Sequence, residues 1–196
     1  MLRTDIQFLK PGPALSVEDV ADASRAIGRG PWPRDYEHYL LRFNGAAPTL
    51  VTPHPDRAQF VRLWWPVGAD AAGYGHNGGV EAFHRLRDDP TRRPDLLDVN
   101  QLIGHRFPPH TFAFANSDGG SRFLFDLRPD RHGQILFWCR PREGTADEQA
   151  QDPYRNVAWV ADNLVDFFNR IEEEPDDWDA WEVAIAPDSA RDWHPR

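Results

Sequence analysis

Disulfides and membrane spans are the features that this sequence most clearly lacks. Cys139 is the single cysteine, so the 196-residue chain cannot form an internal disulfide. Its position in an apolar run predicts a buried thiol rather than a reactive nucleophile. No apolar run approaches the roughly 20 residues that a bilayer span requires, and the initial MLRTDIQFLKPGP has no apolar signal-peptide core. We therefore expect a cytoplasmic protein that makes no contact with a membrane.

The sequence also lacks the motifs of common enzymes. It contains no GxSxG, Walker or paired-carboxylate motif. Residues 73–78, GYGHNG, match the dinucleotide fingerprint GxGxxG, with Asp98 at a distance suited to a ribose hydroxyl. That fingerprint must join a strand directly to a helix, whereas Pro66 and a polar stretch precede these glycines. We therefore interpret residues 73–78 as a loop and expect no nucleotide cofactor.

Histidine is present, but not at metal-binding spacings. The eight histidines form no HxxxH or HExxH pattern, and no cysteine pair accompanies them. We therefore expect no metal and no other cofactor. Asp118 precedes two glycines, where a carboxylate often accepts backbone hydrogen bonds in a turn. The less favoured alternative is an enzyme, a hydrolase or a metal-dependent protein, that uses His76, Asp118 or His132.

The most informative segment that is present runs from Thr111 to Arg140. It contains three short apolar runs separated by NSDGG and PDRHG, whose Gly, Asn and Asp residues suit tight reversals. This pattern predicts a β-meander. Both faces of its strands are apolar, because Leu124 alternates with Phe123 and Phe125. A sheet with two apolar faces must lie inside the domain, covered on both sides.

Helices are predicted on both sides of the meander in the sequence. Ser16 is placed to cap a helix that extends to about residue 27, with Val17, Val20 and Ala21 facing inward and Asp19 at the third position. Pro33 precedes a second helix, Arg34–Phe43, whose apolar stripe is Tyr36, Tyr39, Leu40 and Phe43. Asn44 and Gly45 predict its left-handed end. Leu164, Phe167, Phe168 and Ile171 predict a third amphipathic helix.

The remaining segments give weaker patterns. We expect a strand at residues 60–65, a helix at residues 80–87 and a polar loop at residues 144–155. A last short helix would turn Trp178, Trp181 and Ile185 inward. The sequence therefore predicts an α+β domain over residues 1–196, with a mostly antiparallel mixed sheet, flanking helices and a variable insertion at about residues 66–109.

Negative charge is concentrated near the C-terminus. The segment from Ala161 onward holds 11 acidic and three basic residues, so it carries −8 of the chain's net charge of −9. A field of one sign repels nucleic acid backbones and attracts basic partners over about a Debye length. The residues that we expect to contact such a partner are Glu172, Glu173, Glu174, Asp176, Asp177 and Asp179. The alternative is a solvated face that only keeps the protein soluble.

The order of these segments resembles the SUKH superfamily, the SMI/KNR-type family. A proline precedes an aromatic and aliphatic helix that ends in Asn-Gly, an aromatic strand leads to an Asp/Gly turn and a strand ending in Asp, the next strand ends in Trp, and a final helix contains Phe-Phe. The matching residues are Pro33, Tyr36, Tyr39, Leu40, Leu41, Asn44, Gly45, Phe112 through Asp126, Trp138, Ala161, Asn163, Leu164, Phe167 and Phe168.

The resemblance implies a protein that acts by binding other proteins. Bacterial members resemble immunity proteins that capture the toxin domain of a polymorphic or contact-dependent toxin, frequently a nuclease, and fungal relatives are cell-wall regulators. We expect a basic toxin domain as the partner and no nucleic acid. Trp64, Trp65, Tyr74 and Trp193 are added as aromatic anchors if they are exposed, with core packing as the alternative. A regulatory or scaffolding module without a toxin partner is the second hypothesis.

Overall fold

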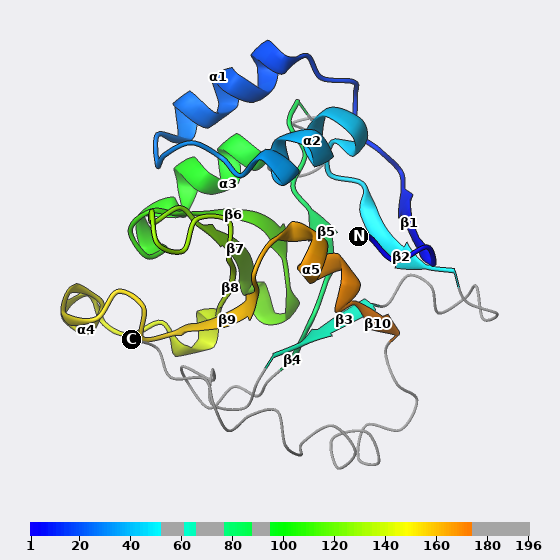
Figure 1. Cartoon of the computed structure of the whole chain (residues 1–196). Helices are drawn as coiled ribbons and strands as arrows, with labels where there is room; N and C mark the ends of the chain where they lie inside the picture. The colour runs from blue at the N-terminus through cyan, green and yellow to red at the C-terminus, as the bar shows by residue number, and fades with distance from the viewer. Residues whose placement is uncertain (52–60, 66–76, 88–94, 174–196) are drawn as a thin grey trace, which may run out of the picture.

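Five strands form the central sheet, in the order β5-β6-β7-β8-β9 (Figure 1). The computed structural model of the chain describes residues 1–51, 61–65, 77–87 and 95–173. Every neighbouring pair in this sheet is antiparallel. The strands are β5 (Ala82–Phe83), β6 (Thr111–Asn116), β7 (Arg122–Asp126), β8 (Ile135–Trp138) and β9 (Val157–Ala161). The predicted meander is thus confirmed as β6, β7 and β8, since tight turns join them.

The central sheet is apolar on both faces, as its sequence predicts. Phe112, Phe125 and Ile135 belong to the larger buried cluster on one face. Leu124 and Trp138 belong to a smaller cluster on the opposite face, because alternate residues of a strand point to opposite sides. All five of these side chains are fully buried. The sheet is therefore an inner layer that other elements must cover on both sides.

Helices cover the two faces. On the side of the larger cluster lie α1 (Val17–Ile27), α2 (Arg34–Phe43) and α5 (Leu164–Asn169) (Figure 1). α3 (Leu96–Leu102) contributes Leu96 to the larger cluster and Val99 to the smaller one. The Tyr36 ring lies 4.9 Å from the Phe125 ring and 5.5 Å from the Phe112 ring, between centroids. Large aromatic side chains thus join α2 to the sheet, which confirms the apolar stripe predicted for this helix.

The first helix begins as predicted, but its buried face differs. Ser16 and Asp19 form a capping box in which each side chain accepts a backbone hydrogen bond, and Gly28 ends the helix in the left-handed conformation. Val17, expected to face inward, is 72% exposed, whereas Val20 and Ala23 are buried. Val17 is the first residue of the helix, where the chain has not yet reached the core, so its side chain points to solvent.

Two smaller sheets flank the central one. β1 (Ile6–Leu9) pairs with β2 (Ala47–Leu50), and a three-stranded sheet has the order β10-β3-β4. Its strands are β3 (Val61–Trp64), β4 (Asn77–Gly79) and β10 (Glu172–Glu173). β3 confirms the strand expected at residues 60–65. The sequence analysis missed β1, β2, β9 and β10.

Three segments differ from the sequence prediction. Residues 80–87 form no helix, because β5 there extends the central sheet. The polar stretch 144–155 contains α4 (Ala146–Gln151), which Thr145 and Glu148 cap reciprocally. Within the interval 66–109, the described residues form β4, β5 and the unpredicted α3. The predicted last helix with Trp178, Trp181 and Ile185 lies outside the described residues.

The Asn-Gly pair after α2 ties three segments together. Asn44 is buried in the left-handed conformation, and its side-chain amide donates to the carbonyl oxygens of Pro13 (2.8 Å) and Leu86 (2.9 Å). Its side-chain oxygen accepts from the backbone N–H of Leu86 at 2.8 Å. Gly45 has a φ of +74°, and a Cβ there would lie 2.8 Å from the carbonyl oxygen of His84. The helix end therefore needs Asn44 for its side-chain hydrogen bonds and Gly45 because no Cβ fits there.

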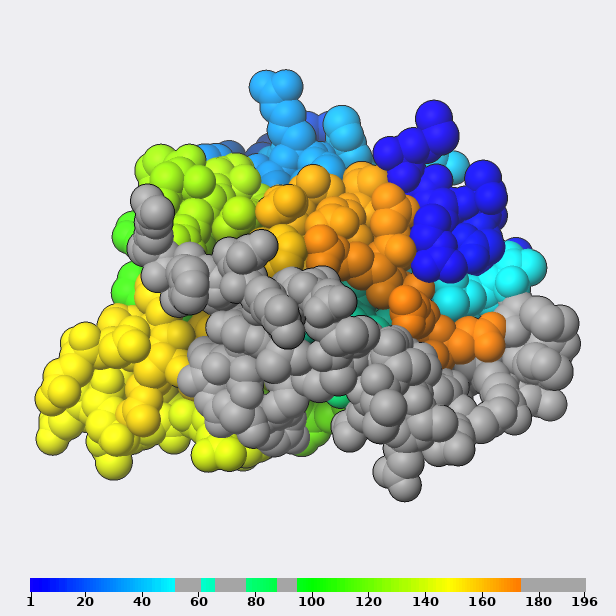
Figure 2. Space-filling view, turned by 60° about the horizontal axis from the view of Figure 1, so that its bottom comes forward, coloured from blue at the N-terminus to red at the C-terminus, as the bar shows by residue number. Residues whose placement is uncertain are grey.

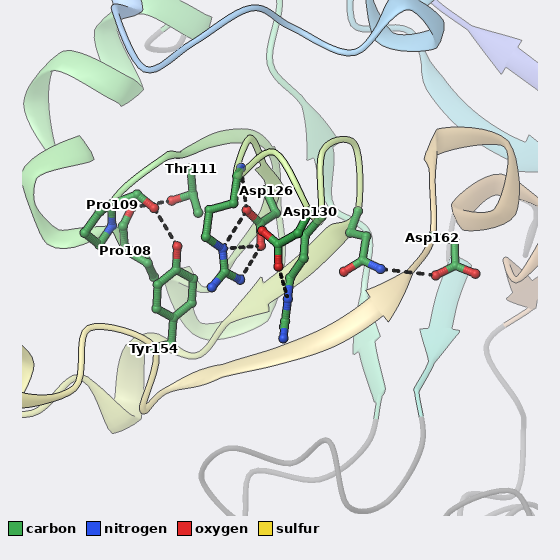
Figure 3. Close-up of polar contacts among 10 residues, drawn as sticks. Pro108, Pro109, Thr111, Asp126, Asp130, Tyr154 and Asp162 are labelled. Carbon is green, nitrogen blue, oxygen red and sulfur yellow. Dashed lines mark hydrogen bonds and ion pairs between the residues drawn. The ribbon is translucent and has the colours of Figure 1, made fainter. Parts of the chain in front are cut away.

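A buried ion pair stabilises the turn after β7. Asp126 is fully buried, and both its oxygens lie 3.0 Å from the Nε of Arg128, whose own backbone N–H also donates to Asp126 (Figure 3). The Arg128 guanidinium lies over the Tyr154 ring, 4.1 Å from its centroid. The Tyr154 hydroxyl donates to the carbonyl oxygen of Pro109 at 2.6 Å. The aspartate that ends the strand thus connects β7 to the segments before β6 and after α4.

We expect Asn44→Ala to lower the free energy of unfolding by about 3 kcal/mol, because three backbone groups, two of them in buried hydrogen bonds, lose a partner. Urea unfolding followed by circular dichroism measures this change. Asn163→Ala is the matched control, since Asn163 makes one N-cap hydrogen bond to Asp166 and its loss costs about 1 kcal/mol. Equal effects of the two substitutions would contradict the role assigned to Asn44.

We expect Asp126→Ala to destabilise the protein by about 2 to 3 kcal/mol, because Arg128 is left partly buried without its carboxylate. Thermal unfolding at pH 7 provides the measurement. Asp130→Ala changes a carboxylate in the same turn that is 75% exposed, so its effect should stay within about 0.5 kcal/mol. If Asp126→Ala is as mild as Asp130→Ala, the buried pair does not hold this turn.

Candidate interaction surface

The acidic C-terminal segment begins inside a sheet. Glu172 pairs with Arg62 and Glu173 with Val61, so the first two acidic residues after α5 form the short strand β10. Glu172 is exposed, and Glu173 is half-buried. The sequence gives no strand signal here, because consecutive glutamates are typical of solvated segments. The structure therefore places the first two residues of the acidic segment in the small sheet.

Arg3, near the N-terminus, binds the residues that lead into β10. Arg3 Nη1 donates to the carbonyl oxygen of Ile171 at 2.7 Å, and the Arg3 backbone N–H donates to the side chain of Asn169 at 2.8 Å. In Figure 2 the blue N-terminal residues accordingly lie beside the orange end of the described chain. Partial burial raises the pKa of Glu172, while the positive charge of Arg3 acts in the opposite direction. The Glu172 carboxylate therefore lies close enough to Arg3 to interact with its charge.

A polar network connects the small sheet to the central sheet. Arg62 Nη2 lies 3.1 Å from the Asp118 carboxylate, and Arg62 Nη1 donates to Asn77 Oδ1 at 2.8 Å. Asp118 also accepts the backbone N–H of Gly79 at 3.1 Å, and the Ser117 hydroxyl donates to the Gly79 carbonyl oxygen at 2.7 Å. Asp118 thus joins the turn after β6 to β3 and β4, a long-range role that its place in the sequence does not reveal.

The two adjacent tryptophans of the predicted anchor set differ in exposure. Trp65 is 4% exposed, and its ring stacks on Phe137 with 4.6 Å between centroids. Trp65 is therefore not exposed, as an aromatic anchor would have to be, and it packs in the core instead. Trp64 is partly exposed on β3, beside the residues that pair with β10. Of the two, only Trp64 is placed to contact a partner.

Six residues of the predicted partner set lie outside the described part of the chain. They are Tyr74, Glu174, Asp176, Asp177, Asp179 and Trp193. Three of the four described members lie on the small sheet, because β10 pairs directly with β3. Glu172 shares a face with Trp64, since it pairs with Arg62, two residues before Trp64, whereas Glu173 pairs with Val61 and faces the other side. This sheet is the candidate interaction surface.

The residues considered for an enzyme do not gather. Asp118 precedes β7 and His132 follows it, so a five-residue strand separates them by roughly 15 Å. Asp118 is held by Arg62 and Gly79, and His132 Nε2 lies 2.9 Å from the carbonyl oxygen of Pro31. His76 lies outside the described residues. Each of the two described candidates thus has a structural contact of its own.

The nucleotide fingerprint and the cysteine have structural explanations as well. Gly78, the last glycine of GYGHNG, lies in β4 rather than at the start of a helix. Asp98 completes the capping box of α3 with Asp95. Cys139 is 3% exposed, as predicted for a buried thiol. In the described residues no group of three His, Cys, Asp or Glu side chains could hold a metal ion, and none of their helices has the length and apolar character of a membrane span.

Comparison with known proteins identifies the family. Residues 14–170 match the SMI1 / KNR4 family (SUKH-1). No curated protein and no solved structure matches the chain. The matched interval begins just before α1, ends just after α5, and contains the whole central sheet. The helix ending in Asn-Gly, the aromatic meander and the Phe-Phe helix on which the resemblance was based all lie within it. The chain therefore belongs to the SMI1 / KNR4 family of the SUKH superfamily.

Proposed function

We propose that this protein is an immunity protein that neutralises a cognate polymorphic or contact-dependent toxin by binding and occluding it. Membership of the SMI1 / KNR4 family supports a toxin-immunity or cell-wall regulatory role in general. The specific proposal is that the partner is a basic toxin domain, possibly a nuclease, and that binding takes place in the cytoplasm.

The observation that carries this proposal is the anchoring of the acidic segment on the small sheet. Net charge is −8 from Ala161 onward and −1 over the rest of the chain, so the electrostatic field is strongly asymmetric. Pairing of β10 with β3 fixes the start of this segment against the folded body. Anchored negative charge can steer a basic partner to one face, and such steering can raise association rates to about 10⁸ M⁻¹s⁻¹ or more at low salt.

We propose further that the protein acts without chemistry of its own. Asp118 and Asp126 are both engaged by arginines, and Asp118 and His132 lie at opposite ends of β7. An inhibitor that works by occlusion requires only a complementary surface, because blocking access to the toxin's site is sufficient. The small sheet places the charge of Glu172 and the aromatic side chain of Trp64 on the same face.

The direct test uses the toxin domain encoded next to the gene for this protein. We expect co-expression of this chain to restore growth to bacteria that produce the toxin domain, and the two purified proteins to form a complex. Reversing the charge of Glu172, Glu173, Asp176 and Asp177 to lysine should lower the association rate at low salt by at least about tenfold and flatten its salt dependence. Stopped-flow or surface plasmon resonance measurements give both values.

The matched control reverses four exposed acidic residues elsewhere on the body, Glu18, Asp22, Asp130 and Asp147. This variant changes the net charge by the same amount, so its smaller effect would show that position matters rather than total charge. If the two variants weaken binding equally, or if neither does, the acidic segment is only a solvated face. If the toxin domain neither binds nor is neutralised, the immunity function itself is wrong.

A further inference from the structure

Three adjacent strands of the central sheet, and the residue that follows a fourth, place polar side chains on the same face and near the same end. Asn116 of β6 pairs with Arg122 of β7, and Arg122 pairs with Trp138 of β8. Directly paired residues project to the same face of a sheet, here the face of the smaller cluster. Ala82 of β5 pairs with Asn116, and His84 lies two residues further on, so it shares that face. We call His84, Asn116, Arg122 and Trp138 the polar row.

Each member of the polar row has a buried atom without a hydrogen-bond partner. These atoms are His84 Nε2, Asn116 Oδ1, Arg122 Nε and Trp138 Nε1, and no hydrogen bond within the described chain satisfies them. His84 is 5% exposed and Trp138 is fully buried. Unpaired buried polar atoms are rare, because each loses its hydrogen bond to water at a cost of about 1 to 3 kcal/mol. Four of them in neighbouring positions of one sheet face therefore call for a common explanation.

The chemistry of these atoms favours an acceptor as the missing group. Arg122 Nε and Trp138 Nε1 can only donate hydrogen bonds. Their strands are neighbours about 5 Å apart, a separation that two oxygens of one anionic group can bridge. Burial, with the charge of Arg122, lowers the pKa of His84 to about 3, so its imidazole is neutral at pH 7 and can donate or accept. The unpaired atom of Asn116 is its side-chain oxygen, which accepts a hydrogen bond and so suits a donor on a neighbouring part of the ligand.

Positive charge converges on the same end of the sheet. The pKa of Arg122 is lowered by burial and by the nearby charges of Arg140 and Arg106, although Glu81 acts in the opposite direction. Arg106 lies over the Trp138 ring, 5.4 Å from its centroid, and is ion-paired with Glu143. Arg140 is exposed and lies against Gly120, and within the described residues it forms no ion pair. Of the three arginines, Arg106 forms an ion pair within the described residues, whereas Arg122 and Arg140 do not.

Arg122 is held in a fixed orientation that leaves its Nε free. Its Nη1 donates to the carbonyl oxygens of Gly120 at 2.6 Å and Ser121 at 2.8 Å. Arg122 and Asn116 are partly exposed, whereas Trp138 lies deeper. A ligand therefore reaches the polar row from the side of Arg122 and Asn116, and neighbouring side chains must move aside to admit it, because the unpaired atoms themselves are buried. The Arg122 guanidinium needs no reordering, since the turn before β7 already fixes it.

We propose that the polar row binds the oxyanion of a small ligand, a carboxylate or a phosphate. Arg122 Nε and Trp138 Nε1 donate to the oxyanion, Arg140 supplies further positive charge, and His84 and Asn116 contact a neighbouring polar group of the ligand. This site is separate from the acidic segment and has the opposite charge preference. It does not depend on the proposed toxin partner.

Nuclear magnetic resonance of the isotope-labelled protein tests this site directly. The chain has eight tryptophans, and Trp138→Phe identifies the indole N–H signal of Trp138. Sodium phosphate and sodium acetate are titrated separately at constant ionic strength, with sodium chloride as the balancing salt. We expect a saturable shift of the Trp138 signal with at least one of the two anions. The anion that binds more tightly identifies the ligand group as a phosphate or a carboxylate.

Variants decide whether the polar row is responsible. Arg122→Lys keeps the charge but removes the Nε donor, and it should weaken anion binding about tenfold. Arg140→Gln changes an exposed residue without burying anything new, so it should weaken binding even if Arg122→Lys fails to fold. Arg25→Lys is the matched control, because Arg25 is exposed and pairs with Asp22 on α1. A Trp138 shift no larger than that caused by chloride, or anion binding that Arg140→Gln leaves unchanged, would overturn the proposal.

Discussion

The structure depends on a sheet that water can wet on neither face. Phe112 and Phe125 face one side of the meander, and Leu124 and Trp138 face the other, so helices must cover both. The aromatic stripe of α2, together with α5, covers one side. Val99 of α3, with Phe107 and Tyr154, packs on the other. Polar contacts also connect a covering helix to the sheet. Asn100 is an example, since its side chain binds the backbone N–H and carbonyl of Ala113 and so attaches α3 to β6.

Elements with strong local signals could be predicted from the sequence. The meander has turn residues between alternating apolar runs, and α1, α2 and α5 have a capping residue or an apolar stripe. The elements that were missed depend on distant partners. β10 consists of two glutamates that form a strand only because β3 lies beside them, and residues 80–87 read as a helix although Ala82 and Phe83 pair with β6. Pairing between distant segments leaves no periodic pattern in the segments themselves.

The candidate site could be predicted only in part, for the same reason. The count of charged residues located the acidic segment but did not predict that it begins in the small sheet. The sequence also could not show that Trp64 is partly exposed while Trp65 is buried. The polar row could not be predicted from the sequence, because only the register of the strands brings its members to one face of the sheet. They are His84, Asn116, Arg122 and Trp138. The molecule thus has acidic residues on the small sheet and three neighbouring arginines at one end of the central sheet. Such a two-signed surface suits a binding protein better than a uniformly acidic one, since each region can select a different chemical group.

The most direct test of the proposed function is hydrogen–deuterium exchange of the protein, alone and in complex with the toxin domain encoded beside its gene. Backbone amides exchange more slowly where a partner covers them or stabilises their hydrogen bonds. Our account predicts slower exchange in the complex for residues 61–64 and 172–173, on the sheet that anchors the acidic segment. Protection confined to α1 and α4, with exchange of β3 and β10 unchanged, would contradict the account.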